Sequence, residues 1–181
     1  MRLIGRLGAA LFATALAAGC ATVPAPTAIT GETLAGRMTV RVDATPSSDS
    51  RSVSAAFELQ GDARQGRLDL STPLGTTLAR ARWTPGLVAL VTPQGETRFA
   101  SLDALTREVL GESVPVAALF DWLHGRPWSG AASVPTTPPA ERGFAQLGWV
   151  VSLARFDEGW IAARREQAPV VTVRAKLDGN P

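Results

Sequence analysis

Side chains that commonly take part in catalysis or metal binding are scarce in this 181-residue chain, which has one Cys, one His and no Tyr. A single cysteine excludes an internal disulfide, and so few ligating side chains exclude the common zinc sites. The HExxH, CxxC, GxSxG and phosphate-loop patterns do not occur in the sequence. The one histidine, His124, follows a predicted helix end, where a capping or dipole role is its ordinary explanation. The sequence therefore predicts neither an enzyme nor a metal or other cofactor.

Excess charge is also lacking. The chain has 18 Lys and Arg against 16 Asp and Glu, and residues 1–19 contribute two of the arginines and no carboxylate. Without residues 1–19 the two signs balance at 16 each. No cluster of basic residues remains that would favour nucleic acid as a partner.

The N-terminus has the pattern of an export signal. Arg2 and Arg6 precede or flank an apolar run that ends at Ala18, and this run is too short to span a bilayer. Small residues then lead to Cys20. This pattern predicts that residues 1–19 are a signal peptide.

Cys20 is a candidate site of lipid attachment. A thiolate is the natural nucleophile for forming a thioether, and the sequence Ala-Ala-Gly-Cys resembles the bacterial lipobox. An ordinary signal peptide with an incidental cysteine is the alternative. Ala21 follows the cysteine in place of the Asp of inner-membrane retention, which favours the outer membrane. We expect residues 20–31 to be the acylated cysteine and a proline-containing flexible tether, reaching about 3 Å per residue where extended.

Residues 32–181 are expected to form one domain in which apolar and polar side chains mostly alternate, as in strands with one buried face. The alternation predicts strands at Met38–Val42, Val53–Leu59, Gly66–Ser71, Thr76–Trp83, Leu87–Thr92, Thr97–Ala100, Trp149–Leu153, Trp160–Arg165 and Val171–Leu177. Segments 45–52 and 131–141, rich in serine or proline, are predicted loops.

Two short helices interrupt this pattern. Leu102, Leu105 and Val109 have helical spacing between a capping Ser101 and Gly111. A second helix after Pro115 carries apolar residues in i, i+3, i+4, i+7 order at Val116, Leu119, Phe120 and Leu123. An antiparallel sheet buries one face, and one-faced helices are a natural cover for it.

The strands at 66–71 and 76–83 meet at an apolar turn, Pro73-Leu74-Gly75. Pro73 ends the first strand and Gly75 supplies turn freedom, so Leu74 lies at or near the loop tip. Two interpretations are open from the residues alone. Leu74 folds back onto the core, or it is an exposed probe for lipid or a partner groove.

Several segments, taken in order, resemble the LolB family of outer-membrane lipoprotein receptors. They are Cys20 after its signal, GRMTVRV, RLDLSTPLGTT, VPVAALFDWLHGRP and FAQLGWVV. The resemblance implies an unclosed antiparallel β-barrel of about ten to eleven strands, with a helical lid over a hydrophobic cavity. It also implies a lipid-anchored protein, expected to be a monomer, on the periplasmic face of the outer membrane. Such a protein accepts lipoproteins from the periplasmic carrier LolA and inserts them into the membrane without covalent catalysis. The family's membrane-inserting leucine matches Leu74.

Apolar strand and helix faces supply candidate residues for an acyl-chain cavity. These are Met38, Val40, Phe57, Leu59, Leu68, Leu70, Leu105, Val109, Leu119, Phe120, Leu123 and Trp149. Two alternatives remain open: sheet and helices closing over a dry core, and a lipid-anchored assembly protein that binds partners on its sheet.

Overall fold

The computed structural model describes residues 32–179, and these residues form one antiparallel sheet with two α-helices. The strands are β1 (Thr33–Val42), β2 (Arg51–Gly61), β3 (Gly66–Ser71), β4 (Thr77–Thr84), β5 (Leu87–Thr92), β6 (Gly95–Phe99), β7 (Ser133–Pro135), β8 (Gly143–Gln146), β9 (Trp149–Ser152), β10 (Trp160–Arg165) and β11 (Val171–Leu177). The signal peptide, Cys20 and the tether predicted over 1–31 lie outside the described residues.

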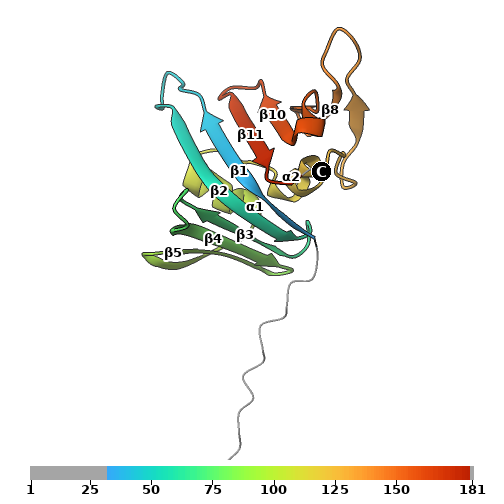
Figure 1. The fold of residues 1–181 in the computed structure, drawn as a ribbon. Helices are drawn as coiled ribbons and strands as arrows, with labels where there is room; N and C mark the ends of the chain where they lie inside the picture. Colours follow the sequence, from blue (N-terminus) through green and yellow to red (C-terminus); the bar gives the residue numbers. More distant parts are fainter. Residues whose placement is uncertain (1–31, 180–181) are drawn as a thin grey trace, which may run out of the picture.

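The strand order is β6-β5-β4-β3-β2-β1-β11-β10-β9-β8-β7, and every neighbouring pair is antiparallel. The first and last described strands, β1 and β11, therefore pair at the middle of the sheet (Figure 1). The outer strands β6 and β7 do not pair with each other, so the barrel is unclosed, as predicted.

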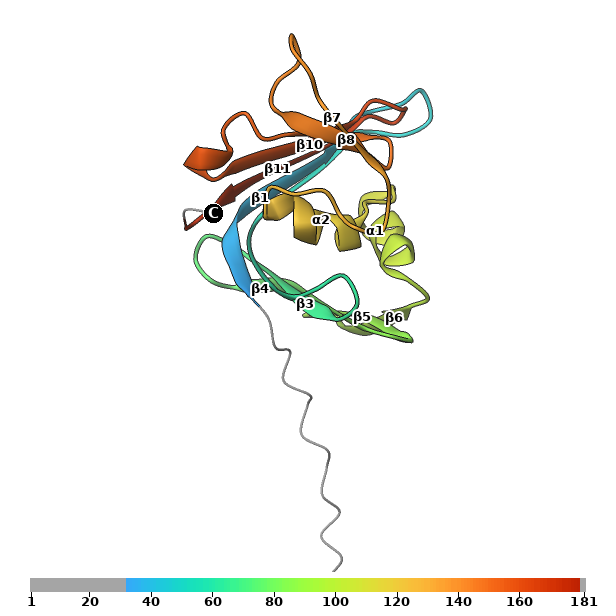
Figure 2. The same cartoon turned by 90° about the vertical axis from the view of Figure 1, so that its right-hand side faces the viewer.

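The helices begin and end where the sequence predicts. Helix α1 (Leu102–Leu110) is capped by the Ser101 side chain, which accepts a hydrogen bond from the Ala104 N–H at 3.1 Å. It ends at Gly111, whose φ of 81° is the left-handed geometry that glycine favours. Helix α2 (Val116–Leu123) follows Pro115. Figure 2 shows the sheet curling around both helices, with β3–β6 on one side and β7–β11 on the other.

Two loop predictions need correction. The segment 131–141 contains β7, because Val134 pairs with Ala145 of β8 and so gains a main-chain partner despite the neighbouring prolines. The loop after β1 is shorter than predicted, since β2 starts at Arg51. The irregular connection 136–142 and the turns at 43–50 remain outside the strands.

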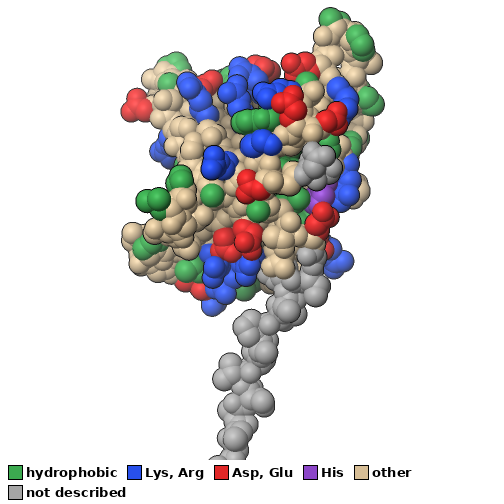
Figure 3. Space-filling model, in the orientation of Figure 1, with side chains coloured by type: hydrophobic (Ala, Val, Ile, Leu, Met, Phe, Trp, Pro, Cys, Tyr) green, Lys and Arg blue, Asp and Glu red, His purple; other side chains and the backbone are tan. Residues whose placement is uncertain are grey.

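The predicted alternation sets the two faces of the sheet. Met38 and Val40 of β1 point inward, while charged side chains lie on the outer face. On that face the Asp69 carboxylate forms ion pairs with Arg67 of the same strand, at 2.8 Å, and with Arg80 of the neighbouring strand β4. Figure 3 shows charged side chains of both signs spread over this side of the molecule. The outer face is polar and the inner face supplies the core.

Candidate functional site

An apolar hollow of about 270 Å³ lies between the inner faces of β1–β5 and the two helices. Its walls carry Met38, Val40, Val53, Ala55, Leu59, Leu68, Leu70, Ala79, Ala81, Leu90, Thr92, Leu102, Leu105, Thr106, Val109, Leu110, Val114, Val116, Leu119 and Leu123. No wall side chain is ionisable, and Thr92 and Thr106 are the only two with a hydroxyl. The hollow can therefore accept hydrocarbon and offers no group for acid–base chemistry.

Thr106 is polar but does not present an unsatisfied group to this space. Its hydroxyl accepts a hydrogen bond from the Val114 N–H at 3.1 Å and donates to the Asp103 carbonyl at 3.3 Å. These two bonds satisfy its polar atom and tie the loop after α1 back to the helix. The hollow keeps an apolar lining at this point.

Nine of the twelve residues predicted to line a cavity lie on these walls. They are Met38, Val40, Leu59, Leu68, Leu70, Leu105, Val109, Leu119 and Leu123. The exceptions are Phe57, Phe120 and Trp149, which are buried in the core away from the walls. Periodicity identified their buried faces but not their depth, because a face that points inward can meet packed side chains instead of open space.

Packing partners explain two of these exceptions. Trp149 lies 6.0 Å from Trp122 between ring centroids, and Phe144 lies 6.4 Å from Trp122. Phe120 packs beside the His124 ring at 5.3 Å. Aromatic rings at such separations form a dense core. The space next to the aliphatic side chains stays open by contrast.

The hollow opens to solvent between β2 and α1. Val53 and Val109 are both wall residues, yet they are 37% and 45% exposed. Deeper wall residues such as Leu123 are almost fully buried. The two exposed wall residues therefore lie where the hollow opens to solvent. We call this opening, at Val53 and Val109, the mouth.

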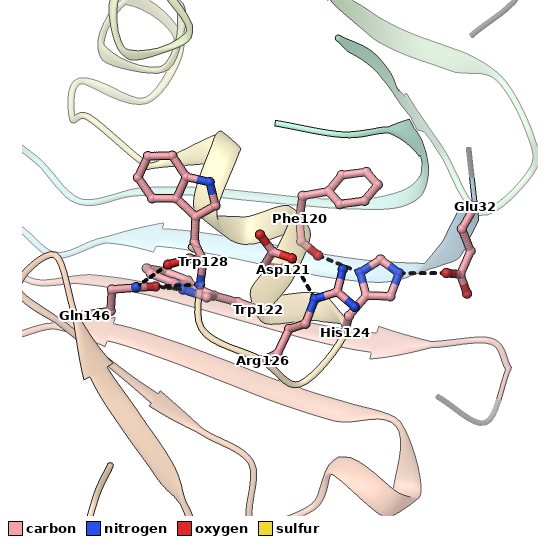
Figure 4. Close-up of polar contacts among 8 residues, drawn as sticks. All are labelled: Glu32, Phe120, Asp121, Trp122, His124, Arg126, Trp128 and Gln146. Carbon is pink, nitrogen blue, oxygen red and sulfur yellow. Dashed lines mark hydrogen bonds and ion pairs between the residues drawn. The ribbon is translucent and has the colours of Figure 1, made fainter. Parts of the chain in front are cut away.

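Helix α2 is held in place by a buried hydrogen-bond network around Gln146 of β8 (Figure 4). The Trp122 indole N–H and the Trp128 backbone N–H donate to Gln146 Oε1 at 2.8 and 2.9 Å. Gln146 Nε2 donates to the carbonyls of Trp128 and Ala131, both at 2.7 Å. All four bonds of the buried amide are made, so the network fixes α2 and the following segment to the sheet. Sequence analysis missed Gln146, whose only signal was a polar residue next to an apolar strand.

The residues after α2 form a second set of contacts, also drawn in Figure 4. His124 Nδ1 donates to the Phe120 carbonyl at 2.8 Å, and its Nε2 lies 3.2 Å from a Glu32 carboxylate oxygen. Arg126 donates to Asp121 at 2.7 Å. The histidine thus caps the helix end, as predicted, and also contacts the first described residue of the chain.

Leu74 stands clear of the core at 95% exposure, which excludes the interpretation that it folds back. The loop beneath it is well ordered by its own bonds. Thr72 N–H donates to Thr76 O and Gly75 N–H donates to Thr72 O, each at 2.9 Å. Gly75 has a φ of 84°, a conformation that glycine adopts without strain. The turn is therefore built to present an apolar side chain to its surroundings.

Comparison with known proteins now places the chain. A family model described as "Outer membrane lipoprotein LolB" matches residues 33–174. Among relatives named "Outer-membrane lipoprotein LolB", that of Bordetella pertussis is 38% identical over 149 residues, covering 79% of this chain and 75% of its own. That of Bordetella petrii is 37% identical over 164 residues, covering 87% and 81%. The protein of Cupriavidus pinatubonensis is 39% identical over 132 residues, covering 71% and 64%.

The chain belongs to the LolB family. The match includes the hollow, the Leu74 loop and the Gln146 network, so the site described above is part of the LolB domain itself. LolB proteins are lipoprotein localisation factors, which confirms the prediction that this chain is not an enzyme. Membership also confirms the prediction of an outer-membrane lipoprotein.

The three charged groups of this LolB domain whose pKa is shifted lie away from the hollow. The hydrogen bond from Arg155 lowers the pKa of Glu158 and raises that of Arg155 itself. A hydrogen bond to Glu166 likewise raises the pKa of Arg164. All three groups are at the surface, and none lines the hollow. Within residues 32–179, no three His, Cys, Asp or Glu side chains are grouped to hold a metal ion, and no helix is long and apolar enough to cross a membrane.

Proposed function

We propose that this protein is anchored by an acylated Cys20 to the periplasmic face of the outer membrane, where it works as a monomer. It accepts acylated lipoproteins from the carrier LolA and passes them into the membrane. The observation that carries the proposal is the apolar hollow, which has no ionisable wall group and opens at the Val53–Val109 mouth.

The wall chemistry suits the cargo. Each buried methylene is worth about 0.8 kcal/mol, so ten of them contribute roughly 8 kcal/mol. Acyl chains with that cost of exposure do not cross water unaided. Direct transfer between apolar sites lowers this cost, and transfer runs toward the site of higher affinity. Binding alone does the work, without a covalent step.

The hollow must widen to take a complete set of acyl chains. Its volume of about 270 Å³ falls below the usual range for sites that enclose drug-sized ligands, about 300–1,000 Å³. Helix α2 is fixed by Trp122 and Gln146, whereas α1 carries the exposed Val109 at the mouth. Outward movement of α1 is therefore the way in which the hollow enlarges.

Leu74 supplies the step at the membrane. Its loop lies outside the hollow and presents a leucine to the bilayer while the tether keeps the domain close to the surface. A single leucine is too weak to anchor a protein, but it biases the orientation of one that is already tethered. Delivery then follows as acyl chains leave the hollow for the bilayer.

Displacement of an apolar fluorescent dye by palmitate tests the proposal. The whole mature chain with Cys20→Ala, exported by a cleavable signal, is expected to bind the dye saturably and release it to palmitate. Leu119→Glu on the wall should weaken this binding, while Leu87→Glu, at an exposed position off the wall, should not. Dye binding that is unchanged in a folded Leu119→Glu variant would refute the hollow as the acyl site. It would favour the alternative of an assembly protein that binds on its sheet.

A further inference from the structure

Near the mouth of the hollow, the first part of strand β2 is paired on one side only. Strand β2 pairs with β1 from Arg51 to Gln60, but its pairing with β3 starts only at Ala56. Strand β3 ends at Ser71, because Pro73 and the Leu74 turn stop the ladder there. In Figure 1, β2 continues past the end of β3.

The register determines which main-chain groups are left open. Asp43 N–H donates to Val170 O at 2.9 Å, and Asp178 N–H donates to Ala35 O at 3.0 Å. The odd-numbered residues of β1 therefore direct their main-chain groups at β11. In an antiparallel ladder these directions alternate along the strand, so the even-numbered residues of β1 point at β2.

The same alternation carries across to β2. Val40 lies opposite Val53, so the odd-numbered residues of β2 point back at β1. Ser52 and Ser54 then direct their N–H and C=O groups to the other side, where β3 has already ended. Both serines are exposed, and in the described part of the chain no strand pairs with them on that side. Ser52 and Ser54 together are called the open edge below.

The two outer edges of this sheet, at β6 and β7, are protected against strand pairing. Strand β6 carries Glu96 and Arg98, paired at 3.4 Å, and β7 is three residues long and ends at Pro135. Charges, short length and proline are the usual devices against unwanted strand pairing. The open edge has only small serines, and the neighbouring Arg51 guanidinium lies against Gly111 at the end of α1.

We infer that the open edge binds the extended peptide that follows the acylated residue of a cargo lipoprotein, by strand addition. This inference rests on the proposed function. Val53, between the two serines, lines the mouth, so a peptide bound at the open edge would lie beside the mouth, where its acyl chains can enter the hollow. Main-chain groups are the same in every peptide, and strand addition gains affinity from them. The hollow then recognises hydrocarbon and the edge recognises backbone, so a receptor for many cargo proteins needs no common cargo sequence.

A ligand series separates the two parts of the site. The probes are S-dipalmitoylglyceryl cysteine alone, the same group followed by five residues, that peptide with its side chains in scrambled order, and two versions N-methylated at alternate amides. Binding is measured by dye displacement on the mature Cys20→Ala chain. We expect the added peptide to increase affinity about tenfold, corresponding to about one or two net main-chain hydrogen bonds. Scrambling should have no effect, and N-methylation in only one of the two registers should remove the gain.

A protein variant gives an independent test. Ser54→Pro removes the N–H that faces the open side, and proline is tolerated where the N–H of a strand residue faces solvent. Ser54→Ala is the matched control, because it removes the same hydroxyl, with its 2.9 Å contact to Thr39, and keeps the N–H. Ser54→Pro should lose the peptide gain and Ser54→Ala should retain it. If Ser54→Pro does not fold, the N-methylated ligands decide alone.

The outcomes distinguish this inference from the function on which it rests. Binding of acylated cysteine with no gain from the peptide, or equal loss in both N-methyl registers, overturns the edge site and leaves the hollow intact. No binding of acylated cysteine overturns the proposed function itself. A Ser54→Pro effect confined to self-association in sedimentation would assign the edge to a second copy of the chain and refute the cargo site.

Discussion

Replacing Leu74 by glutamate should separate cargo delivery from cargo uptake. The side chain is 95% exposed and lies outside the walls of the hollow. Substitutions at such positions usually change the free energy of unfolding by less than about 0.5 kcal/mol. The melting temperature and dye binding should therefore stay close to those of the unmodified protein.

The exposure of Leu74 also sets the free energy that its side chain can contribute when the loop meets the membrane. A leucine side chain gains about 1.5–3 kcal/mol on leaving water for an apolar phase. That range corresponds to roughly a 10- to 150-fold preference of the loop for the bilayer. Glutamate removes this gain and adds a charge that resists desolvation. Leu74→Ala should be milder, since it removes only part of the apolar area.

The assay measures two steps with one labelled lipoprotein. Transfer from LolA to the receptor is followed first, and appearance of the label in vesicles second. Leu74→Glu should leave the first step unchanged and block the second. Val134→Glu is the matched control, because Val134 is 66% exposed on β7, at the outer edge of the sheet on the other side from β3 and β4. An equal delivery defect in Val134→Glu, or a large fall in the melting temperature of Leu74→Glu, would refute the reasoning.

Three further predictions follow from the site. Mass spectrometry of the mature N-terminus should find acyl groups on Cys20, and an unmodified chain that starts elsewhere would contradict the proposed anchor. Gln146→Leu leaves the buried Trp122 indole N–H unpaired and should lower the free energy of unfolding in urea by about 1–3 kcal/mol, whereas loss below 0.5 kcal/mol would show that the network does not hold α2. In the Cys20→Ala chain, a reducible bifunctional thiol cross-link between cysteines placed at Val53 and Val109, on the two sides of the mouth, should block cargo uptake until it is reduced; unaffected uptake by the verified cross-linked protein would exclude opening at this mouth.

The local elements were predictable because their signals are local. Ser101 and Gly111 bound α1 through bonds made within one turn, and the period of two in β1 needs only neighbouring residues. The position of Leu74 at a loop tip was also predictable, because the leucine stands between a proline and a glycine. Its exposure required the structure, because burial depends on what the rest of the chain brings near.

Features that depend on distant segments were not predictable. Gln146 acts through Trp122, Trp128 and Ala131, and nothing near Gln146 in the sequence indicates such partners. Phe57 lies opposite Gly36 and shares the inward face of Leu59, yet only Leu59 reaches the hollow. The alternation of apolar and polar residues shows which face of the sheet a side chain is on. Whether that side chain reaches the hollow depends on how the sheet bends around the helices. The open edge at Ser54 likewise depends on where β3 stops relative to β2.

The pairing of β1 with β11 has a consequence for how the molecule is made. The whole register from Gly36–Leu177 to Val42–Val171 joins segments from opposite ends of the domain. Contacts of such long sequence separation form slowly, because a large loop must close before they are made. As the chain emerges N-terminus first, β1 has β2 as a neighbour but must wait for the final segment on its other side. The halves β1–β6 and β7–β10 stay unjoined until then, so completion of the sheet depends on arrival of the C-terminal strand β11.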